Sequence, residues 1–351
     1  MTSKTKPKTS WIKRTAAFLG ILFLIGATLA ALGLWHMKRF INSPADASGQ
    51  EQVIVIETGK SLKAISKLLA QKKIVTDDTL FTLLVRYKKT ARKIQAGEYS
   101  LSSTMTPEQI LTTLVQGRVL LHRLTIPEGM NLEQTAHIVE SSGFGSKQDF
   151  LALAASPQFA EKLQINADTL EGYLFPETYF FRRDTPQRQI IRQMVQRFNE
   201  VYTPQWQART RDLGFSIHEI VILASIIEKE TGDSSERPVI ASVFHNRLKR
   251  GMRLESDPTV IYGIPDFNGN ITRKDLETTT EYNTYRIKGL PKGPIANPGK
   301  LSLEAALFPA STDFLFFVSR NDTTHKFSKN YEEHKRAVRR YQIKRQGPQI
   351  Q

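Results

Sequence analysis

The chain has 351 residues, 40% of them hydrophobic, and this length and composition favour about two domains with apolar cores. Its formal net charge is +15, which suits an anionic partner such as a membrane surface, an acidic polymer or a nucleic acid. The lack of cysteine excludes disulfides and thiolate metal sites, and the sequence has no HExxH, GxSxG, phosphate-loop or dinucleotide pattern. We therefore expect no metal and no cofactor.

The N-terminus predicts attachment to a membrane. Residues 1–14 carry five basic side chains and no acidic one, and residues 15–37 contain no Asp, Glu, Lys or Arg. An apolar run of this length can cross a bilayer as a helix, and its basic flank favours the cytoplasmic side. We expect a cytoplasmic tail at 1–14, a transmembrane helix at 15–37 and an extracytoplasmic remainder, which argues against nucleic acid as a partner. The alternative is a cleaved signal peptide, for which Ala27, Ala30 and Ala31 supply small residues.

Strand–turn–helix units follow a linker that we place at residues 38–51. The pattern predicts a strand at 53–56, a helix from a Ser61 cap to Leu69, a strand at 97–101 and a helix opened by Thr106 and Pro107. A similar strand, turn and cap recur about 70 residues later, at His122–Ile126 and Asn131, with Gly129 in the place of Gly59. Units of this size resemble LysM-type glycan-binding modules, and ordinary α/β structure is the alternative. We expect an LysM-like α/β module at residues 52–120.

The segment Leu170–Phe180 is unusually rich in aromatic side chains, and it also contains Glu171 and Glu177. Sugar rings pack on aromatic faces, and carboxylates accept hydrogen bonds from hydroxyl and amide groups. The composition therefore suits a carbohydrate cleft. A well-packed turn beneath the core is the alternative.

The segment Ile222–Gly232 predicts a short apolar helix that ends in two carboxylates. At about 100° per residue, Glu230 falls within the apolar stripe of the helix, whereas Glu228 falls on the opposite side. We expect Glu228 to face water and Glu230 to face the interior or a cleft. Apolar surroundings raise the pKa of a carboxyl group and make it a usable general acid near neutral pH. The alternative is that Glu230 marks the fraying end of the helix and pairs with an arginine.

The rest of the C-terminal part is predicted to be scaffold. Amphipathic helices are expected at 185–202 and from about Pro238 to Arg250. A β-hairpin is expected between Phe314 and Phe327, with its strands completing the catalytic sheet. A helix from Tyr331 to about Tyr341 and a basic, disordered end should follow.

Several longer motifs resemble the endolytic murein transglycosylase family (MltG, or YceG-like). They are Ala224–Thr231 (Ala-Ser-Ile-Ile-Glu-Lys-Glu-Thr), Ser256–Tyr262 (Ser-Asp-Pro-Thr-Val-Ile-Tyr), Leu170–Pro176, Gly251–Leu254, Tyr282–Tyr285 and Asn297–Gly299. The resemblance covers nearly the whole chain. It departs from the family pattern at Lys292, at Thr280-Glu281 and at Phe316-Phe317, none of which belongs to the acidic helix.

The resemblance implies a fold and an activity. The fold is α+β, with a single N-terminal transmembrane helix, an LysM-like module and an α+β catalytic domain at 121–351. The activity is that of a peptidoglycan lytic transglycosylase, a lyase that cuts the MurNAc-β-1,4-GlcNAc bond of nascent strands. It leaves 1,6-anhydroMurNAc ends and would stop strand elongation. The location implied is the bacterial inner membrane with the catalytic domain outside the cytoplasm, and the partners are glycan strands, the membrane and the peptidoglycan synthases.

The same resemblance and the helical wheel together assign the catalytic role to Glu230, with Glu228 as the second choice. Glu171, Tyr173, Asn283 and Tyr285 are expected to hold the glycan or to orient the catalytic glutamate. Arg247 and Asp257 could support the site, or be a structural salt bridge and a turn. The alternative for the whole protein is a non-catalytic, membrane-anchored peptidoglycan-binding scaffold, in which Glu230 is structural.

Overall fold

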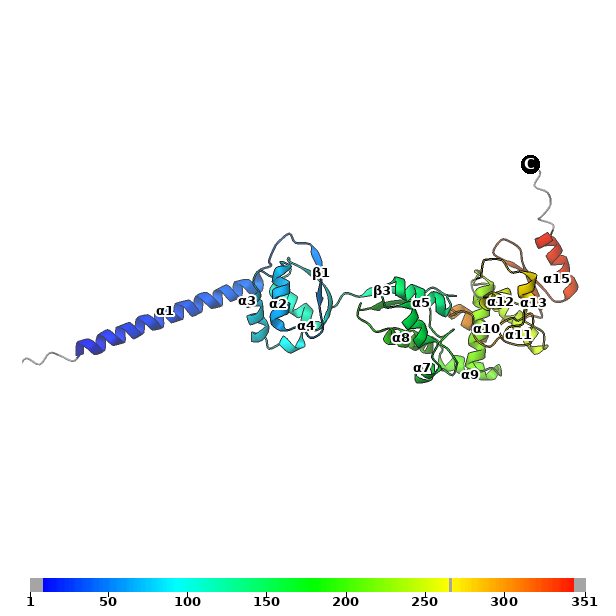
Figure 1. The fold of residues 1–351 in the computed structure, drawn as a ribbon, viewed down its shortest axis with the longest axis horizontal. Coiled ribbons are helices and arrows are strands. Elements are labelled where there is room, and N and C mark those ends of the chain that lie inside the picture. Colours follow the sequence, from blue (N-terminus) through cyan, green and yellow to red (C-terminus); the bar gives the residue numbers. More distant parts are fainter. Residues whose placement is uncertain (1–8, 265–266, 344–351) are drawn as a thin grey trace, which may run out of the picture. The chain divides into compact units, whose positions relative to one another are not determined.

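The computed structural model describes residues 9–264 and 267–343, with side chains from Lys13 onward (Figure 1). Most of the predicted tail at 1–14 and the basic end at 344–351 lie outside the described residues. The chain divides into two compact units, Met1–Leu121 and His122–Gln351. Each unit is described by itself below.

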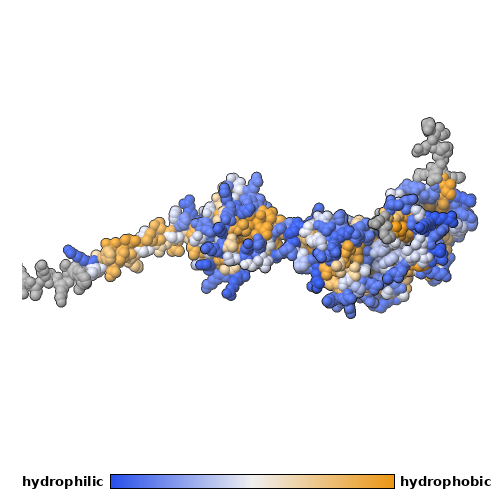
Figure 2. Space-filling view, in the orientation of Figure 1, coloured by the Kyte–Doolittle hydropathy of each residue, from blue (hydrophilic) through white to orange (hydrophobic). Residues whose placement is uncertain are grey.

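The first unit begins with the long helix α1 (Thr9–Asn42). Apolar side chains cover its surface (Figure 2), and its span Lys13–Asn42 is long and apolar enough to cross a membrane as an anchor or to serve as a signal sequence. The helix continues five residues past the predicted end at Met37, so the first part of the predicted linker is helical. The reason is packing, because Phe40 is buried in the core of the following module.

A small α/β module follows α1. Strands β1 (Glu51–Ile56) and β2 (Gly97–Ser102) pair antiparallel, with Ile54 opposite Tyr99. Between and after the strands lie α2 (Leu62–Gln71), α3 (Asp78–Tyr87), the 3₁₀ turn η1 (Ala91–Lys93) and α4 (Pro107–Gln116). The predicted caps are confirmed, since the side chains of Ser61 and Thr106 accept backbone N–H bonds at the starts of α2 and α4. The core lies between the strands and the helices.

The second unit starts with the same order of elements. Strand β3 (His122–Thr125) pairs antiparallel with β4 (Thr178–Phe181), and α5 (Leu132–Ser141), α6 (Lys147–Ala154) and α7 (Pro157–Lys162) lie between them in the chain. The predicted recurrence of strand, turn and cap is confirmed, because Asn131 caps α5. Gly59 and Gly129 take left-handed φ values of 83° and 74° at the two equivalent turns.

Helix α10 (Ile217–Glu230) is the centre of the second unit. It opens with a capping box between Ser216 and Glu219, and every residue from Ile220 to Ile227 is buried. A helix that is apolar on all sides must be covered on all sides. The elements of this region are α8 (Gln187–Val201), α9 (Pro204–Asp212), α11 (Arg237–Lys249), α12 (Asp257–Tyr262), α13 (Arg273–Glu277) and α14 (Lys300–Leu307).

A hairpin and a helix close the described chain. Strands β5 (Phe316–Ser319) and β6 (His325–Ser328) pair with each other and precede α15 (Tyr331–Val338) and the π-helical turn η2 (Arg339–Ile343). The expectation that this hairpin completes a catalytic sheet is wrong, because each sheet in the described chain has two strands. The aromatic side chains of β5 pack on helices instead. Phe316 stacks on His334 at 5.1 Å between ring centroids, and Phe317 meets Phe244 at 5.9 Å.

Candidate active site

Glu228, one of the two acids at the end of α10, is held inside the protein. Its Oε1 accepts a hydrogen bond from Arg237 at 2.9 Å, and its Oε2 accepts one from the backbone N–H of Gly299 at 2.9 Å. Its side chain is only 6% exposed, so the expectation that it faces water is wrong. A helical wheel assumes that the polar face of a helix is exposed to solvent. The Glu228 side of α10 is instead covered by the start of α11. The arginine partner considered for Glu230 thus belongs to Glu228.

Glu230, the last residue of α10, faces a cavity, as predicted. The cavity has a volume of about 320 Å³, and we call it the Glu230 hollow. Its other lining residues are Arg247, Leu254, Glu255, Asp257, Tyr285, Phe316, Phe317, Tyr331 and His334. Burial raises the pKa of Glu230 from 4.5 to about 7, although the hydrogen bond that its Oε1 accepts from Ser256 Oγ opposes this rise. Glu230 can therefore donate a proton near neutral pH.

The loop before α12 carries Ser256 to this position. Glu255 adopts a left-handed φ of 52°, a conformation that costs a non-glycine residue on the order of 1 kcal/mol and persists only where the surroundings impose it. The backbone carbonyl and the hydroxyl of Thr284 accept from the N–H groups of Glu255 and Ser256 at 3.2 and 3.0 Å. Arg247 donates to the carbonyl of Leu254 at 2.9 Å. The loop is thus fixed from two sides, which holds the Ser256 hydroxyl against Glu230.

Asn283 and Tyr285 lie on the segment that supports this loop. Asn283 is buried, and its amide nitrogen donates to the carbonyls of Asp275, Leu276 and Thr278. Its Oδ1 accepts from the backbone N–H of Tyr285 at 2.9 Å. Tyr285 reaches the Glu230 hollow, where its hydroxyl donates to Oδ1 of Asp257 at 2.7 Å. Of this pair, Tyr285 shares the cavity with Glu230, and Asn283 orients Tyr285 from behind.

Glu171 lines a different cavity. This Glu171 hollow has a volume of about 820 Å³, and its lining also includes Asp168, His218, Tyr282 and Lys292. Oε2 of Glu171 accepts from the N–H of Leu132 and from the hydroxyl of Tyr262, each at 3.0 Å. Oε1 is buried with no hydrogen-bond partner among the described residues, and burial raises the pKa of this carboxyl group to about 7.

Tyr173 lies in the core beside the Glu171 hollow. It is 2% exposed, its hydroxyl forms a 2.9 Å hydrogen bond with Nδ1 of His218, and its ring packs edge-on against Phe198. The aromatic segment 170–180 therefore includes the packed turn that was the alternative to a carbohydrate cleft. Neither Glu171 nor Tyr173 lines the Glu230 hollow.

Sequence reasoning missed the C-terminal wall of the Glu230 hollow. Phe316, Tyr331 and His334 come from β5 and α15, far along the chain from Glu230. Arg247 joins this wall to the loop before α12, since its Nε donates to the carbonyl of Leu315 at 2.7 Å and its Nη1 pairs with Glu255 at 3.0 Å. The salt bridge considered for Arg247 is thus present. No local pattern in the sequence could have indicated the aromatic wall.

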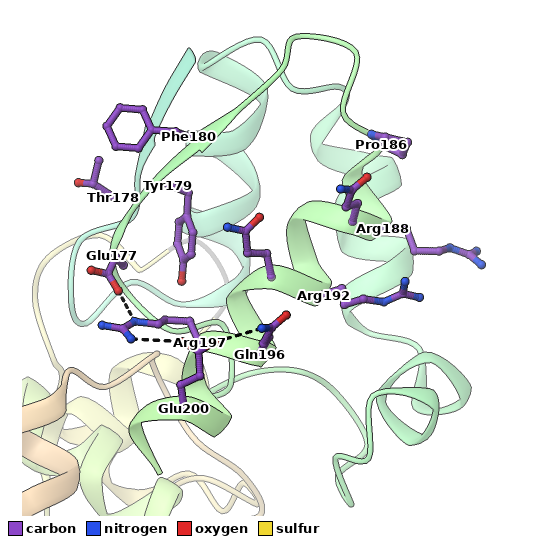
Figure 3. Close-up of a pocket in the computed structure, with 12 residues that line it drawn as sticks. Glu177, Thr178, Tyr179, Phe180, Pro186, Arg188, Arg192, Gln196, Arg197 and Glu200 are labelled. Atoms are coloured by element: carbon purple, nitrogen blue, oxygen red, sulfur yellow. Dashed lines mark hydrogen bonds and ion pairs between the residues drawn. The ribbon is translucent and has the colours of Figure 1, made fainter. Parts of the chain in front are cut away.

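A further cavity of about 680 Å³ lies between β4 and α8 (Figure 3). Its carboxylates belong to Glu177 and Glu200, and Arg197 between them forms ion pairs with both. Both carboxylates are thus bound to a cation, whereas the Glu230 carboxyl group is bound to a neutral hydroxyl. Although this cavity is larger than the Glu230 hollow, its chemistry does not match that of Glu230.

The second unit thus carries an acid–base site, with a carboxyl group of near-neutral pKa at the end of a buried helix and facing a cavity. Comparison with known proteins then defines the family. The YceG-like family matches residues 54–340, and the chain belongs to this family.

Named relatives and a solved structure agree with this assignment. The chain is 35% identical over 304 residues to a Bacillus subtilis protein named endolytic murein transglycosylase, covering 82% of this chain and 84% of that one. It is 29% identical to the Streptococcus pneumoniae D39 protein of the same name, over 92% of this chain but only 64% of that protein's length. The crystal structure of a YceG-like protein from Listeria monocytogenes matches with a TM-score of 0.57 and 35% identity, covering 82% of this chain and 98% of that one.

Proposed function

We propose that this protein is an endolytic peptidoglycan lytic transglycosylase that cuts the MurNAc-β-1,4-GlcNAc bond and leaves a 1,6-anhydroMurNAc end. The observation that carries the proposal is the Glu230 carboxyl group, which faces a cavity and has its pKa raised by burial to about 7. The proposal agrees with the name of the Bacillus subtilis relative. The alternative, a peptidoglycan-binding scaffold, needs no such acid.

The reaction requires one residue to act first as an acid and then as a base. Protonated Glu230 donates its proton to the glycosidic oxygen as the bond to the anomeric carbon breaks. The resulting carboxylate then takes the proton from the 6-hydroxyl of the same muramic residue, while O6 bonds to that carbon. The nucleophile is intramolecular, so proximity replaces water. The Ser256 hydroxyl occupies Oε1 of Glu230, which leaves Oε2 to carry the transferred proton.

The other predicted site residues take different parts in this proposal. Tyr285 lines the cavity and can contact the sugar, and Asn283 acts through Tyr285. Glu171 binds a more distant part of the glycan from its own hollow. Tyr173 contributes by holding His218 at the edge of that hollow. Glu228, neutralised by Arg237, stabilises the helix end and carries no proton in the reaction.

The cellular setting follows from α1. We propose that this helix is retained as a single-pass anchor in the bacterial inner membrane, with residues 1–14 in the cytoplasm and the module at 52–120 and the catalytic domain at 121–351 outside. The module at 52–120 would bind glycan in the manner of LysM domains. The partners would be nascent glycan strands and the synthases that polymerise them, and cutting would stop elongation.

The test uses the full-length protein purified in detergent and incubated with intact peptidoglycan, with the products weighed by mass spectrometry. Wild type should release internal fragments that end in anhydromuramic acid, and Glu230→Gln should release none. Glu277→Gln, an exposed glutamate on α13, is the matched control and should behave as wild type. Activity lost in Glu228→Gln but kept in Glu230→Gln would show that the acid is assigned wrongly. Binding of glycan without any cutting by wild type would favour the scaffold.

A further inference from the structure

The Glu230 hollow contains two further acidic side chains, Glu255, which is paired with Arg247, and Asp257, for which the proposed one-acid reaction has no use. Asp257 is the first residue of α12 and follows Ser256 directly, so the loop that fixes Ser256 also fixes Asp257. The Asp257 side chain lines the hollow and is exposed, whereas the neighbouring Ser256 is buried. A residue at this position meets whatever occupies the cavity.

A hydrogen bond from Tyr285 orients the Asp257 carboxylate and leaves one of its oxygens available. Oδ1 accepts from the Tyr285 hydroxyl at 2.7 Å, and Oδ2 has no hydrogen-bond partner among the described residues. Tyr285 is itself held from behind by Asn283. The negative charge of Asp257 acts on both neighbours, because it contributes to the raised pKa of Glu230 and of Tyr285. The three groups therefore lie within electrostatic reach of one another.

The other charged and titratable groups of the hollow leave this charge uncompensated. Arg247 has its Nη1 bonded to Glu255 at 3.0 Å and to the carbonyls of Arg253 and Leu254, and its Nε to the carbonyl of Leu315. The remaining titratable groups that face the hollow are those of Glu230, Tyr285, Tyr331 and His334. Burial lowers the pKa of His334, which favours its neutral form. Of the three acidic side chains that line the hollow, Glu230 is half-buried, Glu255 is exposed but paired with Arg247, and Asp257 is exposed with no cation bound to it among the described residues.

We propose that Asp257 is a second catalytic carboxylate, which stabilises the positive charge that develops at the anomeric carbon when the glycosidic bond breaks. This inference rests on the proposed function. The C1–O4 bond breaks as Glu230 protonates O4, positive charge spreads over C1 and the ring oxygen, and O6 then bonds to C1 while its proton returns to Glu230. Asp257 gains no proton and forms no bond. Tyr285 is the positioning residue that turns Oδ2 of Asp257 toward C1.

Two other roles for Asp257 give different outcomes. A carboxylate that activates water, or that attacks C1 itself, belongs to glycoside hydrolysis and adds one water to the product. Removal of a purely structural carboxylate at the start of α12 would change stability and would shift the pH limb through the pKa of Glu230, but it would leave kcat on the acidic side of that limb unchanged. The same experiment separates all three roles.

The experiment compares full-length wild type with Asp257→Asn and Tyr285→Phe, and measures rates and product masses on intact peptidoglycan over a range of pH. Loss of one preorganised electrostatic contact lowers kcat by about 10²–10³-fold, so Asp257→Asn should lose at least about 10²-fold with unchanged product mass. The falling, alkaline limb of the pH–rate profile of Asp257→Asn should also move to lower pH, because the removed charge no longer raises the pKa of Glu230. Tyr285→Phe should lose about tenfold, as expected for one hydrogen bond to a charged group. Asp313→Asn, at an exposed ion pair with Lys329, is the matched control and should behave as wild type.

Several outcomes would overturn the inference. Asp257→Asn that keeps kcat within about twofold, or loses rate without moving the pH limb, would exclude the stabilising role while the proposed function stands. Products heavier by one water that disappear in Asp257→Asn would make Asp257 part of a hydrolase. Absence of cutting by wild type would end the proposed function, and this inference with it. Should Asp257→Asn melt below the assay temperature, Tyr285→Phe decides, and unchanged kcat in that variant would exclude the role.

Discussion

The hydrogen bond between Ser256 and Glu230 leads to a quantitative prediction for the pH dependence of activity. Burial raises the pKa of Glu230 to about 7, and the bond that its Oε1 accepts from Ser256 Oγ lowers it from a still higher value. A hydrogen bond to a charged group is worth about 1.5–3 kcal/mol, and about 1.4 kcal/mol corresponds to one pKa unit. Ser256→Ala should therefore raise the pKa of Glu230 by about one to two units.

The direction of the effect on rate follows from the role of Glu230 as an acid. The reaction starts from its protonated form, so kcat/KM falls as pH rises through the pKa of the free enzyme. In Ser256→Ala this falling limb should move to higher pH by about one to two units. The assay is the release of anhydromuramic ends from peptidoglycan across the limb. The control is Ser302→Ala, which removes another buried hydroxyl, one with no hydrogen-bond partner among the described residues. A limb that stays in place, or moves to lower pH, would refute the reasoning.

Two further predictions concern stability, measured by urea unfolding of the full-length protein and followed by tryptophan fluorescence, in which Trp206 of α9 reports on the second unit. The raised pKa of Glu171 gives stability that is complete below its unfolded value of 4.5 and is lost as pH rises to about 7. In wild type the free energy of unfolding should therefore fall by roughly 3 kcal/mol across this window, and in Glu171→Gln this fall should be absent. A variant with the same pH dependence as wild type would contradict the assignment. Arg237→Met leaves Glu228 buried without a cation and should lower the free energy of unfolding by about 3–5 kcal/mol. Adding Glu228→Gln should recover most of that loss, and a double variant as unstable as Arg237→Met would contradict the pairing.

Local signals in the sequence predicted most of the elements well. Caps at Ser61, Thr106 and Asn131 are confirmed, because a hydroxyl or amide side chain bonds to N–H groups within one turn. The apolar N-terminal run is one helix, as expected from its composition. The end of that helix was placed too early, since the contact that extends it, the burial of Phe40 in the module, is made by distant residues.

The candidate site was predicted only in part, because a periodic pattern shows one helix and not its neighbours. The wheel gave Glu230 the correct environment but misplaced Glu228, whose cover is supplied by Arg237. Asn283 and Tyr285 belong to one sequence motif, and the motif did not show that they have different positions. The amide of Asn283 bonds to the carbonyl of Thr278, whereas Tyr285 reaches the cavity. The placement of Glu171 and Glu230 in different cavities depends on how the second unit folds. The spacing of residues along the chain does not show it.

The two acids at the end of α10 show how one helix can yield a single catalytic group. Both are removed from bulk water by the same packing, and the difference between them lies in the partner that each one meets. Glu228 meets a guanidinium group, which compensates its charge inside the protein. Glu230 meets a hydroxyl group, which donates one hydrogen bond but brings no charge, so desolvation still dominates and the proton is retained near neutral pH. A second arginine in place of Ser256 would make the two positions alike, and the Glu230 carboxyl group would then lose its raised pKa.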